Sequence, residues 1–221
     1  MDANFWHERW EKNQLGFHQP EANTLLSKYW LDLDVEPDSA VFVPLCGKSL
    51  DMHWLHDHGH PVVGVEISPV AIRDFFAEAG FDVEREADGA LEAFRAPGFE
   101  LYCGDLFDLE AASVSSVRAC YDRGSLVALP PDIRKRYAEH LIRILPRRVT
   151  ILMISVEYDQ SKMSGPPHSV PPTEVEALFG SAFELEILWQ SEWLEAGPMF
   201  KARGLDVRRD VVLRLDRGGR A

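Results

Sequence analysis

The 221-residue chain has little cysteine, no signal-like start and no long apolar run. Its three cysteines, Cys46, Cys103 and Cys120, are odd in number and show no paired spacing. We therefore expect reduced thiols, no structural disulfide and a cytoplasmic location. Residues 1–6 lack the charged and apolar stretches of a secretory signal, and no segment is long and apolar enough to predict a membrane span.

Positive charge is also scarce. Lys and Arg total 23 against 36 Asp and Glu, which gives a net charge of −13. Nucleic acids and anionic membranes attract basic surfaces, so we expect neither as a partner. Hydrophobic residues make up 46% of the chain and can bury a large core. The length predicts one domain over residues 1–221, and no heptad or exposed apolar strand calls for a second subunit, so a monomer is expected.

Two glycine-rich motifs of nucleotide-binding proteins are missing. No GxGxxG is present, which argues against a NAD-linked oxidoreductase. The Gly47-Lys48-Ser49 sequence resembles the end of a phosphate loop, but Phe42 stands where that loop needs its first glycine. A nucleoside triphosphate is therefore not the expected ligand.

Four histidines between residues 53 and 60 raise the question of a metal site. His53 and His56 are one helical turn apart, but no cysteine or carboxylate completes a ligand set, and Gly59 interrupts the helix before His60. We expect no metal.

Apolar strands alternate with helices through most of the chain. Near-continuous apolar strands indicate a parallel sheet buried on both faces, and their alternation with helices indicates a doubly wound α/β fold. Two later segments alternate apolar and polar residues, as an antiparallel hairpin does. The prediction is a mostly parallel, seven-stranded sheet with strands at 40–45, 61–66, 99–103, 117–122, 149–156, 183–189 and 206–215 and helices at 4–15, 49–58, 69–79, 131–145 and 173–180. A further helix runs to about Trp30, and either Asn23 caps its start or Pro20 lies just ahead of it.

Polar residues fall where the predicted strands end, which is the edge at which such sheets bind ligands. They are Glu66, Asp105, Asp122 and Arg123. Glu66 comes 19 positions after Gly47, near the spacing at which a carboxylate binds ribose hydroxyls. The alternative is a solvated strand-end carboxylate. Asp105 can accept from an adenine amine, with Leu106 against the ring, although Asp108 could equally be a helix cap.

Arg123 follows Asp122 at the end of another apolar strand. An arginine there is a permanent cation that can pair a cofactor carboxylate or stabilise a thiolate. The alternative is a surface ion pair between the two residues.

Aromatic residues outside the sheet can form a lid. Trp6, Trp10 and Phe17 lie in the helical region 1–30, and a proline-rich loop covers 166–172. Core packing is the default for each, but together they can cover a flat ligand.

Eight stretches of the chain resemble the thiopurine S-methyltransferase family in its bacterial form. The most specific is the Pro-Leu-Cys-Gly-Lys turn, because most methyltransferases dependent on S-adenosylmethionine (SAM) have more glycine there. The stretches are Phe5-Trp-x3-Trp10, Gly16-Phe-His-Gln19, Phe42-Val-Pro-Leu-Cys-Gly-Lys48, Gly59-His-Pro-Val-Val-Gly-Val-Glu-Ile-Ser68, Leu101-Tyr-Cys103, Leu106-Phe-Asp-Leu109, Asp122-Arg-Gly124 and Gly165-Pro-Pro167.

The resemblance implies a class I methyltransferase that uses SAM and releases S-adenosylhomocysteine. It implies direct in-line transfer to the thiolate of an aromatic or heterocyclic thiol such as a thiopurine. Because bacterial members are associated with methylating sulfur, selenium and tellurium species, it also implies selenium or tellurium acceptors. Phe17 would lie near the acceptor, Asp122 and Arg123 would line its pocket, and Arg203 is a candidate for a second basic group. By motif position the cofactor contacts would be Trp10, Leu45, Glu66, Asp105, Leu106 and Arg123.

A non-enzymatic alternative is a SAM-binding sensor. The aromatic lid and the proline-rich loop suggest a second ligand, which a sensor would not need.

Overall fold

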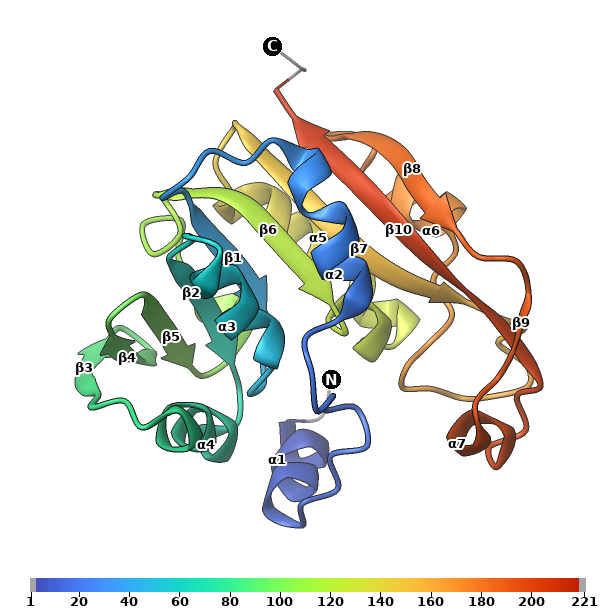
Figure 1. Ribbon diagram of the computed structural model, residues 1–221, viewed down its shortest axis with the longest axis horizontal. Coiled ribbons are helices and arrows are strands. Elements are labelled where there is room, and N and C mark those ends of the chain that lie inside the picture. Colours follow the sequence, from blue (N-terminus) through green and yellow to red (C-terminus); the bar gives the residue numbers. More distant parts are fainter. Residues whose placement is uncertain (1–2, 219–221) are drawn as a thin grey trace. The chain divides into compact units, whose positions relative to one another are not determined.

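A computed structural model describes residues 3–218 (Figure 1). These residues divide into two compact units. The N-terminal unit comprises residues 3–121 and 144–146, and the C-terminal unit comprises residues 122–143 and 147–218. Among residues 3–218, no helix combines the length and the apolarity that crossing a membrane requires.

A parallel sheet lies at the centre of the N-terminal unit. Strand β2 pairs in parallel with β1 and β5, and β1 pairs in parallel with β6. Because β1 and β2 are buried along their whole length, they read as continuous apolar runs. The elements are α1 (Ala3–Glu11), α2 (Thr24–Tyr29), η1 (Leu31–Leu33), β1 (Ala40–Pro44), α3 (Leu50–Asp57), β2 (Val62–Glu66), α4 (Pro69–Ala79), β3 (Glu84–Asp88), β4 (Leu91–Ala96), β5 (Phe99–Cys103), η2 (Leu106–Asp108) and β6 (Val117–Arg123), whose last two residues belong to the C-terminal unit.

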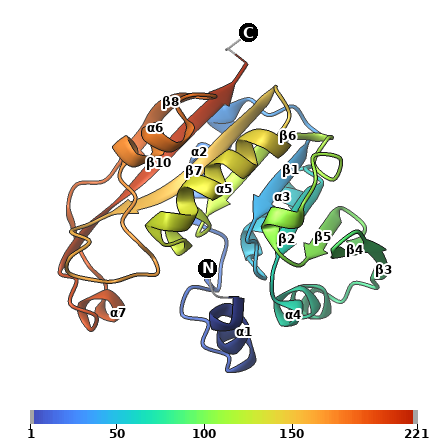
Figure 2. The ribbon, with the colours of Figure 1, turned by 180° about the vertical axis from the view of Figure 1, so that it is seen from behind.

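The C-terminal unit is built on antiparallel strands. Strand β10 pairs with β7 on one side and β8 on the other, which confirms the predicted antiparallel hairpin. Figure 2 shows α5 and α6 on the same face of these strands. The elements are η3 (Leu126–Ala128), α5 (Pro131–Ile144), β7 (Val149–Glu157), α6 (Pro172–Phe179), β8 (Glu184–Gln190), β9 (Leu194–Glu195), α7 (Pro198–Lys201) and β10 (Val207–Arg217). The last residue of α5, Ile144, belongs to the N-terminal unit.

All seven predicted strands are present, and residues 3–218 contain three further strands that were not predicted, β3, β4 and β9. The missed hairpin β3–β4 turns through Gly89-Ala90, with Gly89 at a φ of +61°. Every residue of β3 is exposed and its sequence is charged, so it shows no apolar alternation. Arg95 on β4 binds Glu86 across the hairpin and Glu100 on β5, and these contacts between strands give a pairing that no local pattern reveals.

The first helix is shorter than predicted. Helix α1 ends at Glu11 rather than at residue 15, because Asn13 takes a left-handed conformation with a φ of +51°. Helix α2 begins at Thr24, which confirms Asn23 rather than Pro20 as the residue that sets its start, because the Asn23 side chain accepts from the backbone N–H of Leu25. The four predicted helices that correspond to α3, α4, α5 and α6 agree with the structure to within one residue at each end. Ser49 and Ser68 cap α3 and α4, and Gly80 ends α4 in the left-handed conformation.

Candidate active site

The chain leaves β1 through a tight turn at residues 45–48. Leu45 and Gly47 have positive φ angles of +46° and +54°. Glycine adopts this conformation freely, whereas a leucine does so at a cost of about 1–2 kcal/mol. Non-glycine residues held in this way cluster at ligand sites, and the role of Leu45 as a cofactor contact stays a prediction.

Glu66, the last residue of β2, fastens this turn. Its buried carboxylate accepts hydrogen bonds from the backbone N–H groups of Gly47 (2.9 Å) and Ser68 (2.8 Å). Burial raises the pKa of Glu66, and the backbone donors partly oppose that rise. With the residue only 6% exposed, the alternative of a solvated carboxylate is wrong. Each carboxylate oxygen has a further lone pair, so the group can still accept from ribose hydroxyls.

Trp10 packs against the same turn. A Cβ atom added to Gly47 would lie 3.1 Å from the Cζ2 atom of the buried Trp10 ring. The exposed Phe17 ring meets Trp10 edge-on, with 5.6 Å between the ring centroids. The N-terminal segment is anchored by Asp51, whose buried carboxylate accepts from the backbone N–H of Asn23 at 2.7 Å. The structure therefore brings together Trp10, Gly47 and Phe17.

Asp105 and Leu106 follow β5 and differ in their surroundings. Asp105 is exposed and caps η2, because its carboxylate accepts from the backbone N–H of Phe107 at 3.0 Å. The cap predicted as an alternative at Asp108 is wrong, since Asp108 lies inside η2. Leu106 is buried. The exposed Asp105 carboxylate keeps lone pairs for an additional donor, such as an amine.

Two thiols lie close to Glu66. Cys103 is the register partner of Glu66 on β5, and the backbone N–H of Cys46 donates to the Val65 carbonyl. Burial raises the pKa of Cys46 well above its ordinary value. The pKa of Cys103 is raised to about 11, mainly by burial and then by the negative charges of Glu66 and Glu92. Both thiols are therefore protonated at neutral pH.

We expect Cys103 to resist alkylation at about pH 8. A pKa raised from 9.0 to about 11 lowers the reactive thiolate fraction about a hundredfold at that pH. Iodoacetamide labelling followed by peptide mass spectrometry measures the rate, and Cys103→Ser assigns the peptide. A rate as fast in the native protein as in the urea-unfolded chain would contradict the shift.

In the C-terminal unit, Asp122 and Arg123 end β6. The Asp122 carboxylate is 1% exposed and accepts from the Tyr137 hydroxyl (2.7 Å) and the Leu126 backbone N–H (3.2 Å). Burial raises the pKa of Asp122, and these hydrogen bonds partly oppose the rise. This burial contradicts the alternative of a surface ion pair. Asp122 fastens the turn that follows the half-buried Arg123.

Tyr137, whose hydroxyl holds the Asp122 carboxylate, was not predicted from the sequence. On α5, Arg134, Tyr137, Leu141 and Ile144 are all buried, at a spacing that marks the inner face of a helix. That spacing could have identified the face. It could not have identified the contact with Asp122, because the contact joins residues 15 positions apart on a helix and a strand.

The proline-rich loop lies beside the same turn. The backbone N–H of His168 donates to the carbonyl of Val127 at 2.6 Å. Arg203 donates to the carbonyls of Gly165 and Pro166, both at 2.8 Å, so its guanidinium braces this loop.

The histidines of residues 53–60 have aromatic partners. His53 stacks on Phe75, His58 stacks on Trp54, and His60 accepts from the indole N–H of Trp30 at 3.1 Å. Within residues 3–218, no three His, Cys, Asp or Glu side chains are grouped so as to hold a metal ion.

The sequence matches one family over nearly all its length. A family model described as thiopurine S-methyltransferase (TPMT) matches residues 1–218. The chain belongs to the thiopurine S-methyltransferase family. A thiopurine S-methyltransferase of Nitrosospira multiformis is 44% identical over 215 residues, covering 97% of this chain and 98% of that protein. One of Xanthomonas axonopodis pv. citri is 45% identical over 217 residues, covering 98% and 100%.

The fold resembles that of solved methyltransferases. The 1,6-didemethyltoxoflavin-N1-methyltransferase of Burkholderia thailandensis, solved with S-adenosylhomocysteine bound, superimposes with a TM-score of 0.63 at 14% identity, covering 98% of this chain and 87% of that one. The predicted fold class is thereby confirmed. Family membership confirms the predicted enzyme class, a methyltransferase with SAM as its methyl donor.

Proposed function

We propose that this enzyme transfers the methyl group of SAM to the sulfur of an aromatic or heterocyclic thiol, such as a thiopurine. The family match supports the reaction class. The structural observation that carries the proposal is the buried Glu66 carboxylate, held against the Gly47 turn at the carboxyl end of β2. In open α/β sheets this is where ligands bind and where a carboxylate meets ribose hydroxyls.

The residues of the N-terminal unit fit the cofactor. Glu66 has acceptor capacity for the ribose hydroxyls, and the exposed Asp105 carboxylate can accept from the adenine amine. Leu45 and Leu106 supply apolar surface for the adenosine part, and Trp10 supplies a large aromatic face beside Gly47. The absence of a side chain at Gly47 allows this ring to lie close to the backbone of the turn.

When bound, SAM supplies a methyl group that passes in line to the acceptor thiolate. The chain contributes position and charge. Arg123 pairs with the carboxylate of the cofactor and favours the thiolate over the thiol. We assign Asp122 a positioning role, because its oxygens are occupied by Tyr137 and Leu126. An aromatic thiol is partly ionised at neutral pH, so positioning and desolvation suffice without a strong general base.

Residues 1–30 form the proposed lid over this site. Its described part carries the aromatic contact of Phe17 with Trp10, and Phe17 would face the acceptor. We further propose a monomeric, cytoplasmic enzyme, which agrees with the three free cysteines. Selenium and tellurium compounds belong in the acceptor screen, because a selenolate is chemically close to a thiolate.

Isothermal titration with S-adenosylhomocysteine, followed by a methylation assay with aromatic thiols, tests the function. We expect binding in the micromolar range, the common affinity range of small-substrate enzymes, and S-methylated product by mass spectrometry. Absence of binding would refute the methyltransferase function. Binding without turnover on any thiol or selenol would favour the SAM-binding sensor.

A further inference from the structure

Helix α5 carries an arginine on its buried face. Arg134 is 2% exposed and is among the largest fully buried side chains of the described chain. Burying a guanidinium is costly unless its N–H groups are hydrogen-bonded and its charge is paired. The contacts that compensate this cost therefore indicate what Arg134 does.

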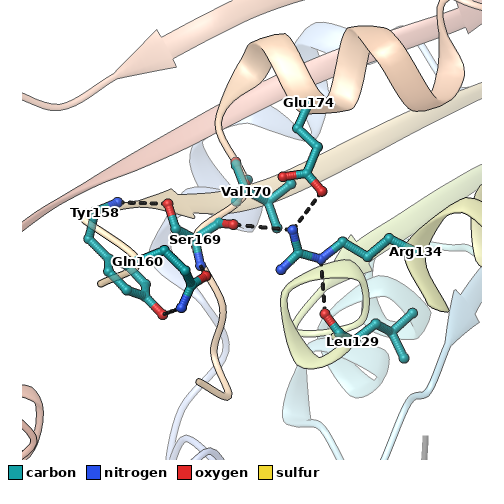
Figure 3. A network of polar contacts seen from close by, with 8 residues as sticks. Leu129, Arg134, Tyr158, Gln160, Ser169, Val170 and Glu174 are labelled. Atoms are coloured by element: carbon teal, nitrogen blue, oxygen red, sulfur yellow. Dashed lines mark hydrogen bonds and ion pairs between the residues drawn. The ribbon is translucent and has the colours of Figure 1, made fainter. Parts of the chain in front are cut away.

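The guanidinium of Arg134 joins three segments of the C-terminal unit (Figure 3). Its Nε–H donates to the Leu129 carbonyl (2.9 Å), at the start of α5. Its Nη1 donates to the Ser169 carbonyl (3.3 Å) and to the carboxylate of Glu174 on α6 (2.6 Å). Its Nη2 is buried and has no partner within the described structure, and such a group commonly binds an internal water.

The loop that Arg134 holds has no regular secondary structure at residues 165–171. Pro166 and Pro167 lack a backbone N–H, so the loop cannot be stabilised by a ladder of its own. Side chains fix its carbonyls instead. The Arg203 side chain donates to the carbonyls of Gly165 and Pro166, and the Tyr158 hydroxyl donates to the carbonyl of Pro167. Arg134 donates to the carbonyl of Ser169, and the Ser155 hydroxyl donates to the carbonyl of Val170.

The same loop is tied to the turn after Arg123. His168 donates its backbone N–H to Val127, and Asp122 holds the backbone N–H of Leu126 in that turn. Because Arg134 binds Leu129 just after the turn and Ser169 in the loop, one guanidinium fixes the spacing between them.

We propose that Arg134 is a positioning residue for the methyl acceptor. It holds residues 166–168 at a fixed distance from the turn that follows Arg123. This inference rests on the proposed function and identifies what shapes the acceptor side of that site. Burial, followed by the charges of Arg134 and Arg203, lowers the pKa of His168, so its ring is neutral at neutral pH. Residues 166–168 thus offer two proline rings and an uncharged imidazole, a surface suited to a flat aromatic thiol.

Arg134→Lys tests the proposal, because it keeps the charge but loses the fork that binds two carbonyls at once. We expect the KM for an aromatic thiol to rise about tenfold, while kcat at saturation and the Kd for S-adenosylhomocysteine stay within about twofold. Lys135→Met, at the exposed neighbouring position of the same helix, is the matched control. It should leave the KM, the kcat and the Kd unchanged. Glu174→Gln keeps an acceptor oxygen for Arg134 and should give a smaller rise in KM.

The outcomes separate three explanations. A variant with a lower melting temperature and a smaller active fraction, but an unchanged KM for the thiol, would show a merely structural role and overturn the proposal. If Arg134→Lys does not fold, an unchanged KM in Glu174→Gln has the same meaning. A wild-type enzyme that binds no S-adenosylhomocysteine or methylates no thiol removes the proposed function and this inference with it. An active wild type with an unaffected Arg134→Lys variant removes the inference alone.

Discussion

Replacing Glu66 with alanine is expected to weaken the binding of S-adenosylhomocysteine at least about a hundredfold. The substitution removes the acceptor for the ribose hydroxyls and leaves the backbone N–H groups of Gly47 and Ser68 without their partner. Hydrogen bonds to charged groups contribute about 1.5–3 kcal/mol each. Losing the two hydrogen bonds from the ribose hydroxyls to Glu66 therefore corresponds to a factor of about a hundred or more in Kd. Isothermal titration measures the change directly.

Glu92→Ala is a matched control for this experiment. Glu92 and Glu66 are both register partners of Cys103, on β4 and β2 respectively, but Glu92 is exposed. We expect its removal to leave the Kd unchanged. Glu66→Gln should be intermediate, since the amide keeps one acceptor oxygen but replaces the other with an NH2 group, which can only donate. A Kd within about threefold of wild type in Glu66→Ala would show that Glu66 only fastens the turn, since a lost charged hydrogen bond costs more.

The affinity should also depend on pH with a definite sign. Ribose hydroxyls donate to the ionised carboxylate, so cofactor binding favours ionised Glu66 and binding weakens as the pH falls through its raised pKa. Folding has the opposite sign. Burial favours the protonated form, so the contribution of Glu66 to the free energy of unfolding is largest at low pH and is lost as the pH rises through that pKa. Glu66→Gln should show neither dependence.

The sequence predicted the parallel part of the fold because burial marks it locally. Strand β2 is an apolar run ending in Glu66, and its spacing from Gly47 predicted a carboxylate at the ligand-binding edge of the sheet. The hydrogen bond from the Gly47 backbone N–H to that carboxylate was not predicted from the sequence. Strand β3 carries no such mark, because it is exposed on every residue and is held by cross-strand pairs of Arg95. Patterns within one segment report burial, and they do not report which distant segment provides a partner.

Asp122 shows the same limit at the site. Its place at the end of an apolar strand predicted a site residue, but the hydroxyl that binds it lies on α5, 15 positions later. The orientation of the carboxylate depends on this partner. The same holds for Arg134, because its position on α5 does not predict its hydrogen bonds to the carbonyls of Leu129 and Ser169.

Arg123→Ala is expected to reduce kcat/KM for an aromatic thiol about a hundredfold. Removing one donor that stabilises developing or resident charge at a reacting centre typically costs a factor of about 10²–10³. Arg123→Lys keeps the positive charge but loses the planar fork, so it should retain part of the activity. Arg118→Ala is the control, because Arg118 lies on the same strand but is exposed near its opposite end.

The pH profile of Arg123→Ala separates its two proposed effects. If Arg123 favours the thiolate, the variant should recover activity at higher pH, where the acceptor ionises without assistance. If Arg123 mainly pairs with the carboxylate of the cofactor, the Kd for S-adenosylhomocysteine should rise, and the loss should persist at every pH. Normal turnover together with normal cofactor affinity would refute both roles.

Asp122→Asn should lower kcat/KM much less than Arg123→Ala does. Asp122 acts on Arg123 only indirectly, by accepting hydrogen bonds from Leu126 and Tyr137 around the turn that follows it.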